Sequence, residues 1–363
     1  MADYSPDFDI QSYHLEVPQS QIAQYPAQVR EDSRLLVLRR ETGVLTHTRF
    51  RHIADFLPEG ACLVANNSKV FPARLYGHKP RTGGSVELLL TTPLPLLQTE
   101  QLEQGWKGAY ATGVLRPSKR VRHDERLRFD GDLEFRVRDR EEYGHVEGEL
   151  LWSGDLAQIL ERVGDIPLPP YINRSGEPVD RERYQTVFAQ EAKKGSAASP
   201  TAGLHFSRET FESLRRKNIL WTEISLHVGY GTFSPLRERD IREHRIHAEY
   251  MEVPEETAER VNRARSEGRP VVALGTTSTR ALETATHSDG TVSPWHGWSD
   301  LYIYPGYRFR CVNHMITNFH LPDSSLILLV SAFTGRKQLL RAYKNAIQEG
   351  YRFYSYGDAM LIL

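Results

Sequence analysis

The stretch "LRFDGDLEFRVRDREEYGHVEGEL", residues 127–150, decides the fold class because its apolar residues recur at every second position. These alternating positions are Leu127, Phe129, Leu133, Phe135, Val137, Val146 and Leu150. The dipeptides Asp-Gly at 130–131 and Tyr-Gly at 143–144 separate the three runs. Period-two alternation broken by turn dipeptides is typical of antiparallel strands with one buried face. We therefore predict a small antiparallel β-barrel domain, inserted over residues 70–159, to which "HKPRTGGSVELLLTT" (78–92) adds a hairpin.

The sequence on both sides of this insert alternates between helical and strand patterns. Residues 254–268 and 336–350 have helical spacing, and "PVVALGTT" (270–277) predicts a buried strand. "SDLYIYPGYRF" (299–309) is also strand-like. This alternation predicts a discontinuous α/β main domain over residues 1–69 and 160–363, with a mixed sheet or barrel-like core and flanking helices.

The composition limits the class of protein. The 363 residues carry 46 Lys and Arg against 47 Asp and Glu, so nothing marks a strongly basic chain, although RNA binding needs only a local basic patch. Cys62 and Cys311 belong to no CxxC pair, which argues against a disulfide framework or a cysteine zinc site. The N-terminus lacks an apolar signal core, and the apolar run 325–333 has about half of the roughly 20 residues that cross a bilayer. We expect a cytoplasmic monomer without membrane association.

The stretch "GSAASPTAGLHF" (195–206) places small residues around one titratable ring, His205. Small side chains allow the backbone to approach a ligand closely, and Pro200 restricts the chain. A close-packed crossing of two elements, with His205 in the core, explains the same residues. The stretch alone leaves both interpretations open.

Two glycine-containing segments suggest ligand contacts. "VVALGTTSTRALE" (271–283) runs from a strand through hydroxyl residues into a helix, so Thr277 or Ser278 is expected to cap an anion-attracting helix N-terminus. An ordinary capped helix is the simpler explanation of that pattern. In "LHVGYGTFSPL" (226–236), Gly229 and Gly231 indicate tight backbone, but Ser234 at the third glycine position excludes a dinucleotide-binding loop.

Three further segments carry titratable groups. "EHRIHAEY" (243–250) holds His244, His247 and Glu249; a helix would bring the two histidines onto one face, but no third ligand makes a metal site. "ITNFHLPDSSL" (316–326) places His320 before a helix that starts near Ser324, where an imidazole tends to stay neutral. The basic run "LRPSKRVRHDERLRF" (115–129) suits a phosphate backbone or a solvated surface equally.

Taken together and in order, these segments resemble one family. The matching blocks are "YHLEVPQSQIAQYPA", "SRLLVL", "NNSKVFPARL", "TGGSVELLL", "IPLPPYINR", "YQTVFA", "PTAGLHF", "LHVGYGTF", "GTTSTRALE", "ITNFHLPDSSL" and "YRFYSYGDAM". The chain resembles the S-adenosylmethionine:tRNA ribosyltransferase-isomerases of queuosine biosynthesis. The resemblance is weakest over residues 92–160.

This resemblance implies a reaction. The ribosyl part of S-adenosylmethionine, consumed as a sugar donor, would move onto the aminomethyl group of a 7-deazaguanine at the wobble position of a tRNA anticodon. The products would be epoxyqueuosine-tRNA, adenine and methionine, and no metal is implied. A base must remove a proton at the ribose 5′ carbon, and an acid must protonate the departing adenine. A non-catalytic RNA-binding protein is the alternative, and the missing GxGxxG pattern argues against a conventional methyltransferase.

The resemblance also suggests which residues carry the chemistry. Proton transfer is expected from His205, His227, His247, His320 or Glu249, with base and acid left unassigned. We expect Thr276, Thr277, Ser278 and Arg280 to hold the methionine carboxylate. Further substrate contacts are expected from Asn67, Lys69, Arg74, Thr201, Gly203, Gly229, Gly231, Asn318 and Asp358. Arg120, Arg122, Lys193 and Lys194 are expected to contact tRNA phosphates.

Overall fold

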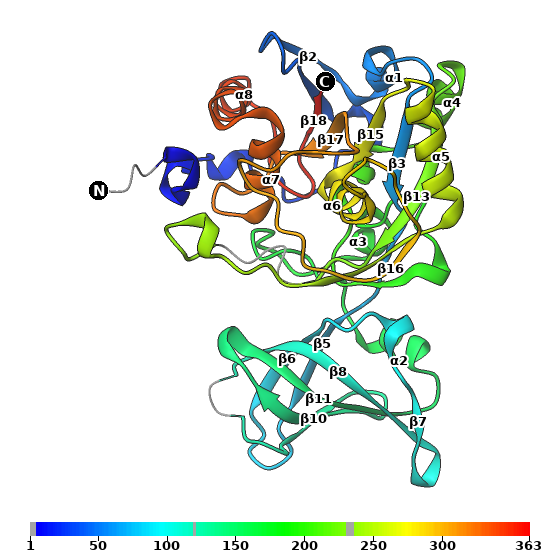
Figure 1. Ribbon diagram of the computed structural model, residues 1–363. Helices are drawn as coiled ribbons and strands as arrows, with labels where there is room; N and C mark the ends of the chain where they lie inside the picture. Colours follow the sequence, from blue (N-terminus) through cyan, green and yellow to red (C-terminus); the bar gives the residue numbers. More distant parts are fainter. Residues whose placement is uncertain (1–4, 119–120, 230–235) are drawn as a thin grey trace.

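The computed structural model describes residues 5–118, 121–229 and 236–363. Its two parts are a larger body built on a mixed sheet and a separate β-barrel (Figure 1). None of the helices within the described ranges combines the length and apolar character that a bilayer crossing requires. The prediction of an α/β body with an inserted antiparallel barrel is confirmed.

The sheet of the larger body has nine strands. In spatial order they are β16 (Trp295–Ser299), β14 (Glu249–Val253), β13 (Leu220–Leu226), β3 (Cys62–Asn66), β15 (Val271–Leu274), β17 (His314–Asn318), β18 (Ala359–Ile362), β1 (Arg34–Leu38) and β2 (Leu45–Arg49). The four central strands β13, β3, β15 and β17 are mutually parallel. Their carboxyl ends therefore meet at one edge, the usual ligand-binding edge of such sheets.

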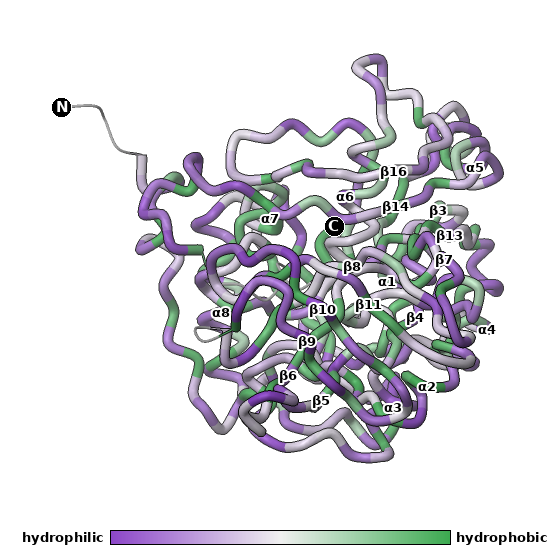
Figure 2. Tube along the Cα trace, turned by 90° about the horizontal axis from the view of Figure 1, so that it is seen from below, coloured by the Kyte–Doolittle hydropathy of each residue, from purple (hydrophilic) through white to green (hydrophobic). Residues whose placement is uncertain are grey.

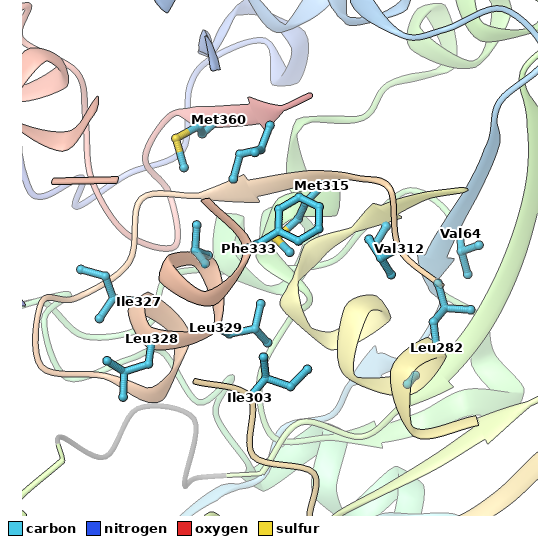
Figure 3. Packing of buried hydrophobic residues seen from close by; sticks show 14 of the residues in the cluster. Val64, Leu282, Ile303, Val312, Met315, Ile327, Leu328, Leu329, Phe333 and Met360 are labelled. Atoms are coloured by element: carbon cyan, nitrogen blue, oxygen red, sulfur yellow. The ribbon is translucent and has the colours of Figure 1, made fainter. Parts of the chain in front are cut away.

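Alternating side chains send the sheet's apolar residues into two cores. In β1, Leu36 and Leu38 join one cluster, whereas Leu35 and Val37 join another. The first cluster includes residues of α5 (Glu255–Ser266), α6 (Gly275–Ala285), α7 (Ser325–Thr334) and α8 (Arg336–Gln348). The second includes residues of α1 (Ile53–Phe56) and α4 (Arg208–Arg216). Figure 3 shows Met315 of the sheet together with Leu329 and Phe333 of α7, all members of the first cluster.

The barrel closes because its first and last strands in spatial order pair with each other. The order is β11 (His145–Ser153), β10 (Leu133–Arg140), β9 (Arg126–Phe129), β5 (Arg74–His78), β6 (Ser85–Leu90) and β8 (Trp106–Arg116), with β7 (Glu100–Gln101) beside β8. Every pairing is antiparallel, and β8 pairs with β11 from Val114–His145 to Trp106–Ser153. All seven alternating residues of the opening stretch lie in the barrel core, and Figure 2 shows hydrophilic and hydrophobic positions succeeding one another along these strands.

The chain enters and leaves the barrel at the same place. Just before β5, β4 (Lys69–Val70) pairs with β12 (Lys194–Ser196) of the larger body. Arg74 and Asp165 then form an antiparallel bridge, with N–H to O distances of 3.2 and 2.9 Å. The helix α2 (Leu156–Val163) contributes Ile159 and Leu160 to the barrel core.

Two local predictions are wrong. Helix α6 begins at Gly275, whose φ of +91° turns the chain directly out of β15, so Thr277 and Ser278 lie inside the first turn and neither caps it. Ser278 Oγ instead donates to the carbonyl of Leu274 at 2.8 Å. The strand-like segment 299–309 has no strand beyond Ser299, the last residue of β16, and a turn at 305–306 divides the remainder.

Candidate active site

The carboxyl ends of three parallel strands form one wall of a pocket. β13 runs into Val228, β15 into Gly275, and β17 into Asn318 and His320, and all four residues line this strand-end pocket of about 50 Å³. Of the predicted site residues, Thr201, Thr276, Thr277, Asn318 and His320 line it. The sequence places these residues far apart, and the parallel sheet brings them together.

The first turn of α6 forms part of the wall of the strand-end pocket. Thr277 Oγ1 is buried and has no hydrogen-bond partner among the residues that the structure describes. The free N–H groups of a helix N-terminus favour a carboxylate or phosphate. Thr276 and Thr277 line the strand-end pocket from this first turn, and neither of them caps the helix.

His320 stands in the strand-end pocket as a neutral imidazole. Its Nε2 lies 2.6 Å from Thr317 Oγ1, and its backbone N–H donates to Tyr343 Oη at 2.8 Å. Burial lowers the pKa of His320 to about 3. The cause is loss of solvent rather than the helix terminus that the sequence suggested.

A second, larger cavity lies between the barrel and the main sheet. This interdomain cleft encloses about 220 Å³ and shares Leu326 with the strand-end pocket. The predicted site residues that line it are His227, Gly229, His247, Glu249 and Arg280. Its opposite wall comes from the barrel, including Thr91, Thr112, His145 and Glu147.

Arg280 and Glu249 form a buried ion pair in the interdomain cleft. Their side chains are 7% and 5% exposed. Arg280 also donates to the carbonyls of Leu301 at 3.2 Å and Ser299 at 3.3 Å, while Glu249 Oε1 accepts from the N–H of Gly229 at 2.9 Å. These contacts give the pair a structural role at the point where β13 leads into the segment after Gly229.

His227 and His247 line the same cleft in different surroundings. Burial lowers the pKa of His227 to about 4, and its Nδ1 has no hydrogen-bond partner within the described ranges. Its ring stacks on Tyr250 with centroids 6.3 Å apart. His247 stacks on His145 of the barrel at 5.1 Å, so one predicted residue contacts the inserted domain directly.

His205 lies outside both cavities, in a small pocket with Arg30 and Arg183. Its ring packs against Phe50 at 5.1 Å, and burial lowers its pKa to about 3. Ser355 lines both this pocket and the strand-end pocket, so the two are adjacent.

The stretch 195–206 divides into a part that lines a pocket and a part that packs closely. Residues 199–202 line the strand-end pocket. At Gly203 a Cβ atom would come within 2.6 Å of Phe188 Cζ and 2.7 Å of Thr186 Cγ2. That glycine permits close packing, as the crossing interpretation expects, while the ligand-wall interpretation of residues 199–202 stays a prediction.

Several predicted residues are engaged elsewhere. Asn67 Oδ1 accepts from Ser225 Oγ at 2.6 Å, and Asp358 accepts from the N–H groups of Arg34 at 2.9 Å and Arg352 at 2.8 Å. Burial raises the pKa of Asp358. Asp358 thus holds backbone, Asn67 bonds a neighbouring side chain, and neither residue lines either cavity.

The predicted basic residues lie mostly in ion pairs. Lys69 pairs with Glu191, Lys193 with Glu252, and Lys194 with Glu161 and Glu191. Arg74 donates to the carbonyl of Leu168 at 2.9 Å. Arg122 lines an open basic groove of the barrel together with Arg81, Arg126 and Arg128. Arg120 and Gly231 lie outside the described residues.

The comparisons with known proteins give the family. A family model described as "Queuosine biosynthesis protein" matches residues 10–362. The chain belongs to this family.

Proteins similar to this chain match it in sequence over nearly their whole length. A protein of Nitratidesulfovibrio vulgaris named S-adenosylmethionine:tRNA ribosyltransferase-isomerase is 53% identical over 98% of each chain. A protein of the same name from Aquifex aeolicus is 46% identical, covering 98% of this chain and 99% of its own. The crystal structure of S-adenosylmethionine tRNA ribosyltransferase from Thermotoga maritima aligns with a TM-score of 0.52 at 34% identity, over 98% of this chain and 100% of that one.

The family member's cleft also contains residues that the sequence did not suggest. His145, Tyr250 and Trp298 line the interdomain cleft, and Tyr171 and Ser355 line the strand-end pocket, where their hydroxyls lie 2.7 Å apart. No group of three or more His, Cys, Asp or Glu side chains in the described part of the chain is arranged to hold a metal ion.

Proposed function

We propose that this protein transfers and isomerises the ribosyl part of S-adenosylmethionine onto the 7-aminomethyl-7-deazaguanine of a tRNA anticodon wobble position. The products are epoxyqueuosine-tRNA, adenine and methionine. The observation that carries the proposal is 53% identity over 98% of both chains with a relative named for this activity. Location in the cytoplasm and action as a monomer belong to the same proposal.

The strand-end pocket suits the methionine end of S-adenosylmethionine. A carboxylate at the first turn of α6 would accept from backbone N–H groups and from Thr277 Oγ1, which is otherwise without a partner in the described structure. Thr276 lies beside it. Because Arg280 is already paired with Glu249, its part in this reaction is to hold the cleft's shape rather than to clamp the carboxylate.

Neutral histidines next to the two cavities suit the proton transfers. The proton on the 5′ carbon, acidified by the sulfonium, passes to a base, and the departing adenine takes up a proton. His227 and His320 are both held in the neutral form that accepts a proton. His227 is the stronger candidate base because its Nδ1 has no partner among the described atoms, whereas Nε2 of His320 is engaged by Thr317.

Transfer of the sugar requires the RNA base to enter the same site. The wobble nucleotide lies in a single-stranded loop and is therefore easily splayed out of its stack. The basic groove around Arg122 and the lysines Lys193 and Lys194 are the proposed phosphate contacts. RNA phosphates would have to replace the carboxylates that now pair with these basic side chains. We therefore expect the RNA affinity to depend on the salt concentration.

The test is a product assay. The purified protein is incubated with S-adenosylmethionine and a tRNA carrying the 7-aminomethyl-7-deazaguanine, and free adenine and methionine are measured. One adenine and one methionine per modified tRNA are expected, and the same tRNA with unmodified guanine is the matched control. S-adenosylhomocysteine would indicate a methyltransferase, and RNA binding without any product would indicate a non-catalytic RNA-binding protein.

A further inference from the structure

The interdomain cleft has an aromatic floor that the proposed reaction chemistry does not use. Tyr250 of β14 and Trp298 of β16 are directly opposite each other in the antiparallel ladder, with ring centroids 5.8 Å apart at 78°. Both line the cleft. The edge-to-face contact fixes the orientation of the indole relative to Tyr250.

Trp298 is more exposed than most large aromatic residues of the described structure. Glu249, Met251 and Val253 of β14 are buried, so Tyr250 lies on the opposite face of the strand. Trp298 shares that face and is 57% exposed. In Figure 1, β16 runs along the side of the larger body that faces the barrel. An indole therefore stands in the entrance between the two domains rather than in a core.

The surroundings of this pair match a nucleotide better than a purely apolar ligand. His227 also stacks on Tyr250 and lines the same cleft, which adds a third ring to the pair. Across the cleft, the hydroxyls of Thr91 and Thr112 lie 2.9 Å apart on the barrel wall and offer donors and acceptors. Lys193 reaches Glu252, two residues beyond Tyr250 on the same face, and places a cation beside the rings.

We propose that Tyr250 and Trp298 form an aromatic ledge that stacks an unpaired nucleobase of the RNA substrate at the entrance of the interdomain cleft. Single-stranded RNA is bound in this way when bases stack on aromatic side chains and a nearby cation meets the phosphate. The ledge is a binding element for RNA and makes no contact with S-adenosylmethionine. This inference rests on the proposed function, because it requires RNA to be the substrate.

The first test is direct binding of a labelled anticodon stem-loop RNA without S-adenosylmethionine. Trp298→Ala is expected to raise the Kd about tenfold, since one base-aromatic stack contributes on that order. Trp298→Phe keeps an aromatic face and should retain most of the affinity. Trp295→Ala is the matched control, because Trp295 is an exposed tryptophan (39%) on the same strand but does not line the cleft.

The second test identifies the base. Stem-loops with one abasic position each are bound to wild type and to Trp298→Ala. At the stacked position, the affinity lost by removing the base and the affinity lost by removing the indole should not add. The KM for S-adenosylmethionine should be the same in Trp298→Ala and wild type. The ledge is overturned if Trp298→Ala binds RNA as tightly as the wild type does. It is also overturned if Trp298→Ala and Trp295→Ala lose equal RNA affinity, or if Trp298→Ala changes the oligomeric state instead of the RNA affinity. Adenine release by the wild type tests the proposed function separately, so the two can fail independently.

Discussion

Arg280 of helix α6 and Glu249 at the start of β14 form an ion pair that solvent hardly reaches. The carboxylate also accepts from the N–H of Gly229, at the end of the segment that follows β13. One pair of side chains thus joins a helix, an antiparallel strand and a loop on the wall of the interdomain cleft. Breaking one partner of such a pair leaves an uncompensated buried charge.

Arg280→Met should therefore be strongly destabilising. We expect its free energy of unfolding to fall by about 3–5 kcal/mol in urea titrations. Arg208→Met is the control, because Arg208 and Glu212 form an exposed pair on α4 and its loss should cost less than about 1 kcal/mol. A loss for Arg280→Met as small as that of the control would show that the pair is not structural.

Thr277→Val tests the carboxylate site at α6. The substitution keeps the shape of the side chain and removes a hydroxyl that lacks a partner in the described structure, so the free energy of unfolding should not fall. The KM for S-adenosylmethionine should rise about tenfold or more, since a hydrogen bond to a charged group contributes about 1.5–3 kcal/mol.

Thr279→Val is the control in the same helix. Thr279 Oγ1 donates to the carbonyl of Gly275 at 3.0 Å and does not line the pocket. Its replacement should reduce stability and leave the KM unchanged. An unchanged KM in Thr277→Val would remove this threonine from the binding site.

His227→Asn should abolish most of the turnover. Loss of a general base typically lowers kcat by about 10²–10⁴-fold, and the KM for S-adenosylmethionine should change little. His314→Asn is the matched control, because burial also lowers the pKa of His314 to about 4 while the residue lines neither cavity. If kcat of His227→Asn stays within a few-fold of that of the control, the base is another residue.

The stability of the protein should decrease as the pH falls from 7 to 5. Burial lowers the pKa of His205 and of His320 to about 3, so in this range the unfolded chain binds protons that the folded chain does not. Each histidine then contributes a slope of up to about 1.4 kcal/mol per pH unit below its ordinary pKa near 6.5. Urea titrations at pH 7, 6 and 5 measure it, and His205→Asn should flatten the slope. A stability that rises toward pH 5 would contradict this assignment.

Local patterns in the sequence were enough to predict the barrel. Residues 127–150 alternate because each strand exposes one face, and that signal needs no knowledge of distant segments. Segment 299–309 is even richer in apolar residues, yet it forms no strand beyond Ser299, and a turn at Pro305 and Gly306 divides it. Propensity alone did not distinguish a strand from an irregular segment whose tyrosines pack against the core.

Local sequence blocks indicated only some of the residues that line the two cavities. The polar residues at 275–277 and 318–320, at the carboxyl ends of β15 and β17, could be recognised in the sequence, and the parallel sheet brings them together. Asn67 and Asp358 lie in equally recognisable blocks, yet their side chains bind backbone or neighbouring side chains away from the cavities. His145 and Thr112 line the cleft from the barrel, where no motif marks them, because their position depends on how the two domains meet.

The bridge between Arg74 and Asp165 joins the segments by which the chain enters and leaves the barrel. The two ends of the insert leave the larger body side by side. The barrel can therefore close its own ring of hydrogen-bonded strands without moving apart the strands of the main sheet that precede and follow it in the chain. For the main sheet, the whole insert is equivalent to a short surface loop, because the two ends of the insert are held next to each other. An insertion of this kind can change in size or sequence over evolution while the strand order of its host stays the same.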